Sequence, residues 1–257
     1  MATTEVLAER RDSLLILTLH RPDRKNALTL SMYDALVDEL QAARTDPTVR
    51  VVLLRGSHGV FTSGNDLMDF MQNPPSGAES PVFRFLLTLV DYEKPIIAAV
   101  EGFAVGIGTT LLLHCDLVYA ADNAQFRLPF VNLALVPEAG SSFILPRMMG
   151  HIKAAELLLL GDKFDAATAA SLGIVNSVVP GATVYEYAEA KARVLASKAP
   201  EALRLSKRLM KQYDREQLKQ IMLEEAVHFA ARLGSPETSE AIQAFFEKRE
   251  PDFSRFS

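Results

Sequence analysis

Short apolar runs separated by helix-length segments are the feature that most constrains the fold of this chain. The runs at residues 49–54, 95–100 and 115–120 have the length and composition of buried strands. Gly56 ends the first run and Gly102 ends the second. Strands that alternate with helix-length segments favour βαβ crossovers, in which neighbouring strands run parallel. We therefore expect an α/β protein with a largely parallel sheet.

The N-terminal part of the chain predicts a hairpin and a helix. Residues 14–19 are an apolar run, and the polar residues 10–13 before it predict a turn that pairs it with residues 6–9. Residues 31–34 fit a capping box, and apolar residues at helical spacing follow. We expect a helix to begin with Ser31 as its cap.

The character of the chain changes after residue 181. Charged residues make up roughly a third of residues 182–257 and roughly a fifth of residues 1–181. One apolar stripe at helical spacing is formed by Leu218, Met222, Ala226, Phe229 and Leu233. Gly234 follows this stripe and predicts the end of the helix. We expect a core over residues 1–181, then a region of three or four helices over residues 182–257 that covers the core or packs against another subunit.

Composition excludes several classes of function. The net charge of −5 leaves no overall basic surface for a nucleic acid. The single cysteine, Cys115, excludes an intrachain disulfide framework, and the five histidines are too scattered for a metal site. No segment reads as a membrane span, and residues 1–12 lack the apolar core of a signal peptide. We expect a cytoplasmic protein with no bound metal, no nucleic-acid partner and no membrane anchor.

Two segments, residues 61–67 and 102–110, place glycine where a predicted strand gives way to a predicted helix. Glycine permits a tight turn and a close approach by another group. The first turn of each helix leaves N–H groups unpaired at the positive end of the helix dipole. If the two helix starts converge, their N–H groups form a site with two hydrogen-bond donors for a carbonyl oxygen that gains negative charge. Either segment alone is most often an ordinary turn, and the spacing fits no dinucleotide- or nucleotide-binding loop.

Seven motifs, in order along essentially the whole chain, resemble the enoyl-CoA hydratase/isomerase (crotonase) superfamily. The matching segments are residues 21–28 (RPDRKNAL), 61–66 (FTSGND), 102–108 (GFAVGIG), 116–120 (DLVYA), 135–140 (LVPEAG), 173–176 (GIVN) and 245–249 (FFEKR). Each motif alone is weak, and the resemblance depends on their order and spacing.

The resemblance implies a fold and a substrate. The fold is a spiral of repeated ββα units with a helical C-terminal region, assembled as a homotrimer or a hexamer. The substrate is an acyl-CoA thioester, so that coenzyme A is part of the substrate and no separate cofactor is needed. The backbone N–H groups of Asn65 and Ile107 are implied to form an oxyanion hole. The residues implied to shape the substrate site around them are Ser63, Gly64, Asp66, Leu67, Gly106, Gly108 and Phe130.

The acidic residues distinguish among the reactions of this family. Its hydratases use two glutamates, and the matching positions here are Thr110 and Phe130. Neither side chain serves well as an acid or base at neutral pH. Glu138 matches the catalytic acid of the Δ3-Δ2-enoyl-CoA isomerases, and the loop at residues 63–66 also resembles that branch. A single carboxylate suffices for this reaction, because it removes a proton from C2 and returns it to C4.

Other interpretations of these residues stay open. Glu138 precedes a predicted helix, where a carboxylate is favoured by the helix dipole alone. The apolar residues around it would raise its pKa if they contact it. Asp66 is interpreted as a helix cap without a chemical role. His114 and Cys115 are interpreted as a buried structural pair, because they lie in an apolar run. Hydration with a relocated acid or base, thioester hydrolysis and non-catalytic acyl-CoA binding are the alternative functions.

The coenzyme requires local positive charge in an acidic chain. Arg21, Arg24 and Lys25 form a basic cluster beside Ala27, in a segment that resembles the one in which the family binds adenosine and pantetheine groups. Lys248, on the last predicted helix, is the other candidate and in the family can reach a neighbouring subunit's ligand. Such cations are otherwise ordinary surface charges. The acyl tail is expected along residues 67–72 or 83–87.

Overall fold

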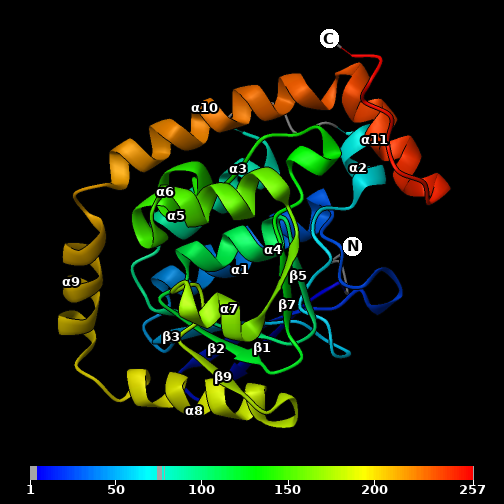
Figure 1. Ribbon diagram of the computed structural model, residues 1–257. Coiled ribbons are helices and arrows are strands. Elements are labelled where there is room, and N and C mark those ends of the chain that lie inside the picture. The colour runs from blue at the N-terminus through cyan, green and yellow to red at the C-terminus, as the bar shows by residue number, and fades with distance from the viewer. Residues whose placement is uncertain (1–4, 74–76, 78, 257) are drawn as a thin grey trace.

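A six-stranded sheet forms the centre of the computed structural model, which describes residues 5–73, 77 and 79–256 (Figure 1). The strand order is β1-β2-β3-β4-β6-β9. The strands are β1 Val6–Arg11, β2 Leu14–Leu19, β3 Val51–Arg55, β4 Ile96–Val100, β6 Leu117–Ala121 and β9 Ser177–Val179. The β1–β2 pair is the predicted antiparallel hairpin, and every other neighbouring pair in this sheet is parallel. The expected parallel α/β architecture is confirmed.

A second, three-stranded sheet has the order β5-β7-β8, with β5 at Phe103–Val105, β7 at Gln125–Arg127 and β8 at Lys163–Asp165. In the chain, β4 of the large sheet is followed by β5 of the small sheet and then by helix α4, Ile107–Thr110. The pair β6 and β7 repeats this order and leads to α5, Ser141–Met149. The repetition is the ββα pattern that the resemblance implied.

The remaining helices surround these sheets. They are α1 Leu30–Thr45, α2 Leu67–Gln72, α3 Pro81–Val90, α6 His151–Ala155, α7 Ala166–Ser171, α8 Val184–Ala196, α9 Pro200–Lys211, α10 Arg215–Leu233 and α11 Pro236–Glu247. Single turns occur at η1 Pro22–Arg24, η2 Leu111–His114, η3 Val131–Leu133, η4 Glu156–Leu160 and η5 Gly181–Thr183. In the part of the chain that the structure describes, no helix combines the length and apolarity that a bilayer span requires.

Both faces of the large sheet are apolar at the central strands β2, β3, β4 and β6, which explains why these four are apolar runs, whereas edge strand β1 is mostly exposed. Leu14, Val51 and Ile97 face α8, whose Val184 and Ala188 pack against them. Because side chains alternate along a strand, the intervening residues point to the other face and into a larger core. Figure 1 shows α8 below the sheet and α10 on the opposite side of the molecule.

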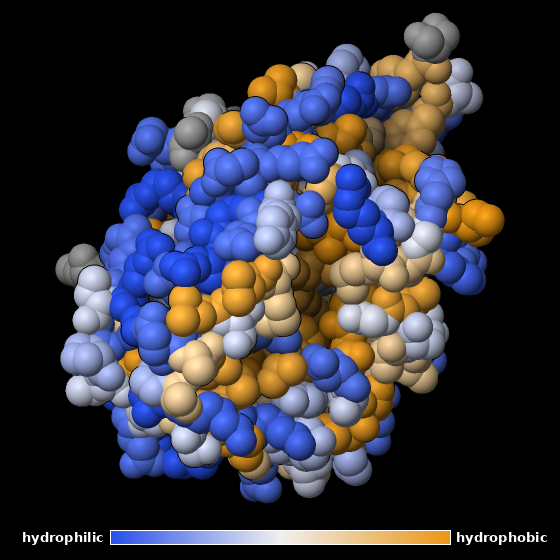
Figure 2. All heavy atoms as spheres, turned by 90° about the vertical axis from the view of Figure 1, so that its left-hand side faces the viewer, coloured by the Kyte–Doolittle hydropathy of each residue, from blue (hydrophilic) through white to orange (hydrophobic). Residues whose placement is uncertain are grey.

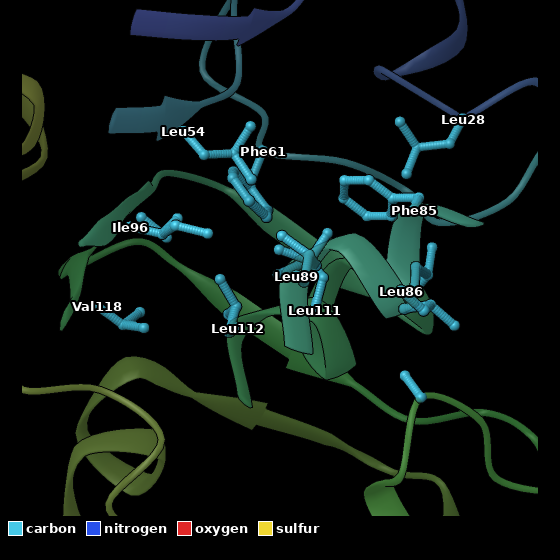
Figure 3. Close-up of a cluster of buried hydrophobic side chains, with 14 of the residues drawn as sticks. Leu28, Leu54, Phe61, Phe85, Leu86, Leu89, Ile96, Leu111, Leu112 and Val118 are labelled. Atoms are coloured by element: carbon cyan, nitrogen blue, oxygen red, sulfur yellow. The ribbon is translucent and has the colours of Figure 1, made fainter. Parts of the chain in front are cut away.

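The larger core joins the sheet to the helices that carry the motifs. Leu54, Ile96 and Val118 come from three strands and meet Phe61, which follows β3 (Figure 3). Figure 3 shows Leu89 of α3 beside Leu111, which directly follows α4. These side chains are at most 3% exposed. The two glycine segments are therefore anchored on the same core, which limits their relative movement.

The predicted apolar stripe of the C-terminal region is confirmed on α10. Met222 and Phe229 are buried, and the other three stripe residues are partly buried against the same core. The helix ends at Leu233, with Gly234 as its C-cap. Residues 182–256, the described part of the C-terminal region, contain four helices, and α8 and α10 cover the core of their own chain.

Three local predictions are wrong. The cap of α1 is Thr29, whose Oγ1 accepts a hydrogen bond from the Met32 N–H at 3.3 Å, and Ser31 lies inside the helix. The helix expected directly after Gly102 begins only at Ile107, because β5 pairs with β7 first. Helix α11 ends at Glu247, and Lys248 follows it with a φ of 56° as the C-cap.

Candidate active site

The two glycine segments, residues 61–67 and 102–110, run side by side. The Thr62 N–H donates to the Phe103 carbonyl at 2.8 Å, and the Val105 N–H donates to the Thr62 carbonyl at 3.2 Å. Thr62 and Ala104 thereby form a parallel bridge. Because the segments run in the same direction, the helix starts that follow them lie at the same end of this bridge. The predicted convergence of the two segments is present in the structure.

Each segment offers an unpaired backbone donor at this end. The N–H groups of Asn65 and Ile107 have no hydrogen-bond partner among the described residues. Ile107 is the first residue of α4, where the N–H has no acceptor within the helix. Gly106, with φ 56° and ψ −119°, allows the chain to pass directly from β5 into α4. Two such donors on adjacent segments suit a carbonyl oxygen on which negative charge develops.

The approach of the two segments requires glycine at two positions. Gly64 has a φ of +98°, and a Cβ there would lie 2.8 Å from the Val105 carbonyl oxygen. A Cβ on Gly108 would lie 2.5 Å from Cγ2 of Thr62. Any larger residue at either position would push the segments apart. The glycines in these motifs are explained by this close packing.

Tyr33 of α1 holds the side chain of Asn65. Its hydroxyl donates to the Asn65 Oδ1, and the tyrosine is fully buried. Burial raises the pKa of Tyr33 well above its ordinary value, and the negative charge of Glu138 adds to this effect. Tyr33 therefore stays a neutral donor, and it lies close to both Asn65 and Glu138.

The segment with the basic cluster lies directly beside the first glycine segment. The Ser63 N–H donates to the Lys25 carbonyl at 3.0 Å, and the Leu28 N–H donates to the Gly64 carbonyl at 2.8 Å. Arg24 and Lys25 are exposed, and the Lys25 ammonium lies 5.6 Å from the centre of the Phe103 ring. Ala27 is buried. The structure therefore brings the segment of Arg24, Lys25 and Ala27 next to the glycine segment that carries Asn65.

Arg21 differs from its neighbours in this cluster because it is already paired. Its guanidinium contacts Asp66 at 2.6 Å and Glu5 at 3.1 Å. Asp66 also accepts hydrogen bonds from the N–H groups of Met68 and Asp69 at the start of α2. Burial alone would raise the pKa of Asp66, but Arg21 and these donors outweigh it and lower the pKa. Asp66 is the predicted helix cap, and Arg21 supports it rather than offering a free positive charge.

Glu138 lines an apolar cavity of about 340 Å³. The side chains around it come from α2, α3 and α10 and include Phe70, Phe83, Leu86, Met222, Ala226 and Phe229. The first three belong to the segments expected to follow the acyl tail. The wall from α10 cannot be predicted from the sequence, because an apolar stripe does not indicate which of its packing residues face a cavity.

The Glu138 carboxylate is buried and unpartnered. It is 8% exposed, and within the described part of the chain no group donates a hydrogen bond to it. Burial raises its pKa to about 8, and the negative charge of Glu225 contributes. A carboxylate with a pKa near neutrality is a better base than an ordinary one. The predicted effect of an apolar environment on Glu138 is present.

The turn that carries Glu138 is strained and tightly held. Ala139 and Gly140 follow with φ values of 60° and 73°. The Ser141 N–H and Oγ both donate to the Glu138 carbonyl, at 3.0 and 2.7 Å. His114 Nε2 donates to the Ala139 carbonyl at 2.8 Å. A non-glycine residue with positive φ persists only where its surroundings fix it, as they do here.

His114 is buried, as predicted, whereas Cys115 is only partly buried against the core. Burial lowers the pKa of His114 to about 4, so its ring is neutral, and the carbonyl it contacts fixes the proton on Nε2. Burial raises the pKa of the Cys115 thiol to about 12, which leaves it protonated and unreactive. His114 does contribute to the site indirectly, because it supports the turn after Glu138.

The helix-start interpretation of Glu138 is wrong, because another carboxylate occupies that position. Helix α5 begins at Ser141, and Glu225 of α10 accepts hydrogen bonds from the Gly140 N–H at 2.6 Å and the Ser142 N–H at 3.1 Å. Glu138 precedes this start and turns into the cavity instead. Nothing in the local sequence around Glu225 indicated this long-range contact.

The two positions of the hydratase glutamates carry no acid. Thr110 is fully buried, and its hydroxyl has no hydrogen-bond partner within the described residues. Phe130 is 4% exposed and belongs to the core rather than to the lining of the Glu138 cavity. Lys248 is exposed after α11 and does not line that cavity. In the described ranges, no group of three or more His, Cys, Asp or Glu side chains is placed to hold a metal ion.

A separate cavity of about 260 Å³ lies where α5 meets the turn between α9 and α10. Its lining includes Phe143, Met148, Met210, Lys211 and Arg215 but none of the predicted site residues. Figure 2 shows the face of the molecule that carries α9, where polar and apolar side chains are mixed and the surface is hollowed near its centre over apolar side chains. Glu138 and Ala139, from the fifth motif, line the other cavity instead.

Comparisons with known proteins agree with these features. The family model for enoyl-CoA hydratase/isomerase matches residues 9–255. The enoyl-CoA delta isomerase 2 of Rattus norvegicus is 36% identical over 95% of this chain, which spans 64% of that protein. The 2,3-dehydroadipyl-CoA hydratase of Escherichia coli K12 is 34% identical over 97% of this chain and 98% of its own length. The solved structure of Pseudomonas aeruginosa OdaA shares 52% identity with a TM-score of 0.93, over 95% of this chain and 99% of that one. Relatives named as isomerases and as hydratases therefore both align with this chain.

Proposed function

Because the chain belongs to the enoyl-CoA hydratase/isomerase family, we propose that it shifts the double bond of a 3-enoyl-CoA to the 2 position with Glu138 as its acid and base. One observation carries this choice: the unpartnered carboxylate in the apolar cavity is Glu138, whereas the two hydratase positions hold Thr110 and Phe130. Glu225 lines the same cavity, but hydrogen bonds from Gly140 and Ser142 already engage both of its oxygens.

In the proposed reaction, the thioester carbonyl accepts hydrogen bonds from the Asn65 and Ile107 N–H groups. The acyl tail then extends into the cavity lined by α2, α3 and α10. Glu138 removes a proton from C2, and the electron pair of that C–H bond forms an enolate whose oxygen is negative. The two N–H donors stabilise this charge, and one such donor typically contributes about 10²–10³ in rate.

The second half of the reaction returns the same proton. Glu138, now a carboxylic acid, protonates C4, and the double bond between C3 and C4 is replaced by one between C2 and C3. The carboxylate is regenerated, and no electrons leave the substrate, so the reaction needs no cofactor beyond the coenzyme A of the substrate. The raised pKa of Glu138 supports this role, because an acid near its pKa both takes and gives a proton readily.

For the coenzyme, we place the phosphates beside Arg24 and Lys25. Both are exposed next to the segment that carries Asn65, whereas Arg21 is neutralised by Asp66 and Glu5. We also propose that Lys248 contacts the ligand of a neighbouring subunit, as the corresponding residue can in the family. Positive charge at this position suits a polyanionic ligand in a chain whose net charge is −5.

The test is a pair of assays on the purified protein. We expect isomerisation of a 3-enoyl-CoA, and hydration of a 2-enoyl-CoA at least about 10²-fold slower, because hydration lacks its second acid or base. Rapid hydration without isomerisation would contradict the assignment of Glu138. Tight binding of acyl-CoA with no turnover of either thioester would indicate a binding protein instead.

A further inference from the structure

Glu225 is a buried carboxylate that the proposed reaction does not use. It lies on α10, is 7% exposed, and lines the same cavity as Glu138. Its Oε2 accepts from the Gly140 N–H at 2.6 Å, and its Oε1 accepts from the Ser142 N–H at 3.1 Å and from the Ser142 hydroxyl. All three donors lie within four residues after Glu138, on Gly140 in the turn and on Ser142 in the first turn of α5. A residue distant in sequence therefore fixes the position of the turn.

These contacts determine what Glu225 can do. With three donors aimed at its two oxygens, it acts only as an acceptor, which is the role of an ionised carboxylate. Burial raises the pKa of Glu225, and the hydrogen bonds from Ser142 and Gly140 oppose this effect. Because its oxygens are engaged, Glu225 is poorly suited to carry a proton between substrate atoms. Glu225 nevertheless lines the same cavity as Glu138, and its negative charge acts on that carboxylate.

The other titratable groups around Glu138 are neutral. Tyr33 approaches from α1 and is a protonated phenol, and His114 approaches from η2 and is an uncharged imidazole. The side chains from α2 and α3 that line the cavity with Glu138 are Phe70, Ser80, Val82, Phe83 and Leu86. Among the groups named here, Glu225 is the one that brings charge.

We propose that Glu225 is a positioning residue for Glu138: it holds the turn so that the Glu138 carboxylate points into the cavity, and its charge makes that carboxylate a stronger base. This inference rests on the proposed function and deepens it. Met222 and Phe229, on the same helix, line the cavity in which the acyl tail is proposed to lie. Helix α10 thus both contacts the tail and sets the position of the base.

The test compares Glu225→Gln with Glu224→Gln, which removes the same charge from the adjacent, exposed position of α10. Two quantities are measured: the pH dependence of kcat for 3-enoyl-CoA, and the titration of Glu138 by carbon-13 NMR of carboxyl-labelled glutamate, with Glu138→Gln to assign the signal. In Glu225→Gln we expect Glu138 to titrate about one pH unit lower, and we expect kcat on the alkaline plateau, where Glu138 is ionised in both proteins, to fall about tenfold with KM changed less than about twofold. Glu224→Gln should match the wild type in both.

The outcomes separate this inference from the proposed function. An unchanged Glu138 titration and an unchanged kcat in Glu225→Gln would overturn the inference. If the wild type does not isomerise 3-enoyl-CoA, the proposed function fails, and the NMR titration alone still decides whether Glu225 acts on Glu138. If Glu225→Gln does not fold, Ser142→Ala removes one of the three donors, and we expect kcat to fall about threefold at constant KM. An unchanged kcat in that variant would then overturn the inference.

Discussion

Glu138→Gln is expected to lower kcat for 3-enoyl-CoA isomerisation by about 10³-fold, with KM changed by no more than a few-fold. Glutamine has nearly the same shape as glutamate and fits the cavity, but it neither removes the C2 proton nor delivers one to C4. The loss should be large because Glu138 is the one cavity carboxylate without a hydrogen-bond partner in the described part of the chain. Steady-state rates and acyl-CoA binding by calorimetry measure the two effects separately.

Glu138→Asp is the matched control for this substitution. Aspartate keeps the carboxylate but withdraws it by one methylene group, so we expect a smaller loss of kcat than in Glu138→Gln. If Glu138→Gln instead turns over at the wild-type rate, Glu138 has no part in the chemistry. A loss of acyl-CoA binding in parallel with kcat would assign Glu138 to binding rather than to proton transfer.

Gly64→Ala is expected to lower kcat/KM by about 10²–10³-fold, the typical effect of losing one donor of an oxyanion hole. The added Cβ would lie 2.8 Å from the Val105 carbonyl oxygen, and the φ of +98° at this position is strained for alanine. Moving the first glycine segment away from the second would relieve both this collision and the backbone strain. The Asn65 N–H, one residue later, would then no longer point to the same oxygen as the Ile107 N–H.

Gly173→Ala controls for backbone strain without a collision. Gly173 also has a positive φ, of +80°, but the nearest atom to an added Cβ is the Cε of Met148 at 3.8 Å, which is an ordinary contact. We expect this variant to lose some stability and to keep its activity. Circular dichroism and thermal melts of both variants show whether they are folded. Full activity in a folded Gly64→Ala variant would contradict the proposed role of the two donors.

Much of the fold could be predicted because it depends on local patterns. Apolar runs gave the positions of β2, β3, β4 and β6, and the stripe on α10 gave the face that packs on the core. The three-residue strand β5 could not be predicted in the same way. It is held by pairing with β7 some 20 residues later, and its glycine-flanked sequence alone resembles the start of a helix. The cap of α1 was misplaced by two residues because Thr29 and Ser31 are both favourable cap residues.

The candidate site also has residues that could be predicted from the sequence and residues that could not. Glu138, Asn65 and Ile107 could be named because each lies in a motif that resembles the family, and their roles stay predictions. Their supporting residues were missed or were interpreted only as structural. Tyr33, His114 and Glu225 reach the site from α1, η2 and α10, and their contacts join residues far apart in the sequence. No periodicity or spacing in a single sequence indicates which buried side chains meet in this way.

Two expectations about assembly stay predictions. One is the homotrimer or hexamer, and the other is the contact of Lys248 with the ligand of a neighbouring subunit. Exposed apolar side chains at Ile152, Leu159 and Leu160 are consistent with burial against another chain. The division of the chain at residue 181 also stays a prediction, although α8 packs directly on the central sheet.

A crystal structure of Glu138→Gln with a bound 3-enoyl-CoA tests the central claim most directly, because this variant should bind the substrate without converting it. We predict the thioester oxygen within about 3 Å of the Asn65 and Ile107 nitrogens, and the residue 138 amide within about 3–3.5 Å of C2 and near C4. A thioester oxygen that contacts neither nitrogen, or an acyl chain whose second carbon lies out of reach of residue 138, would contradict the account.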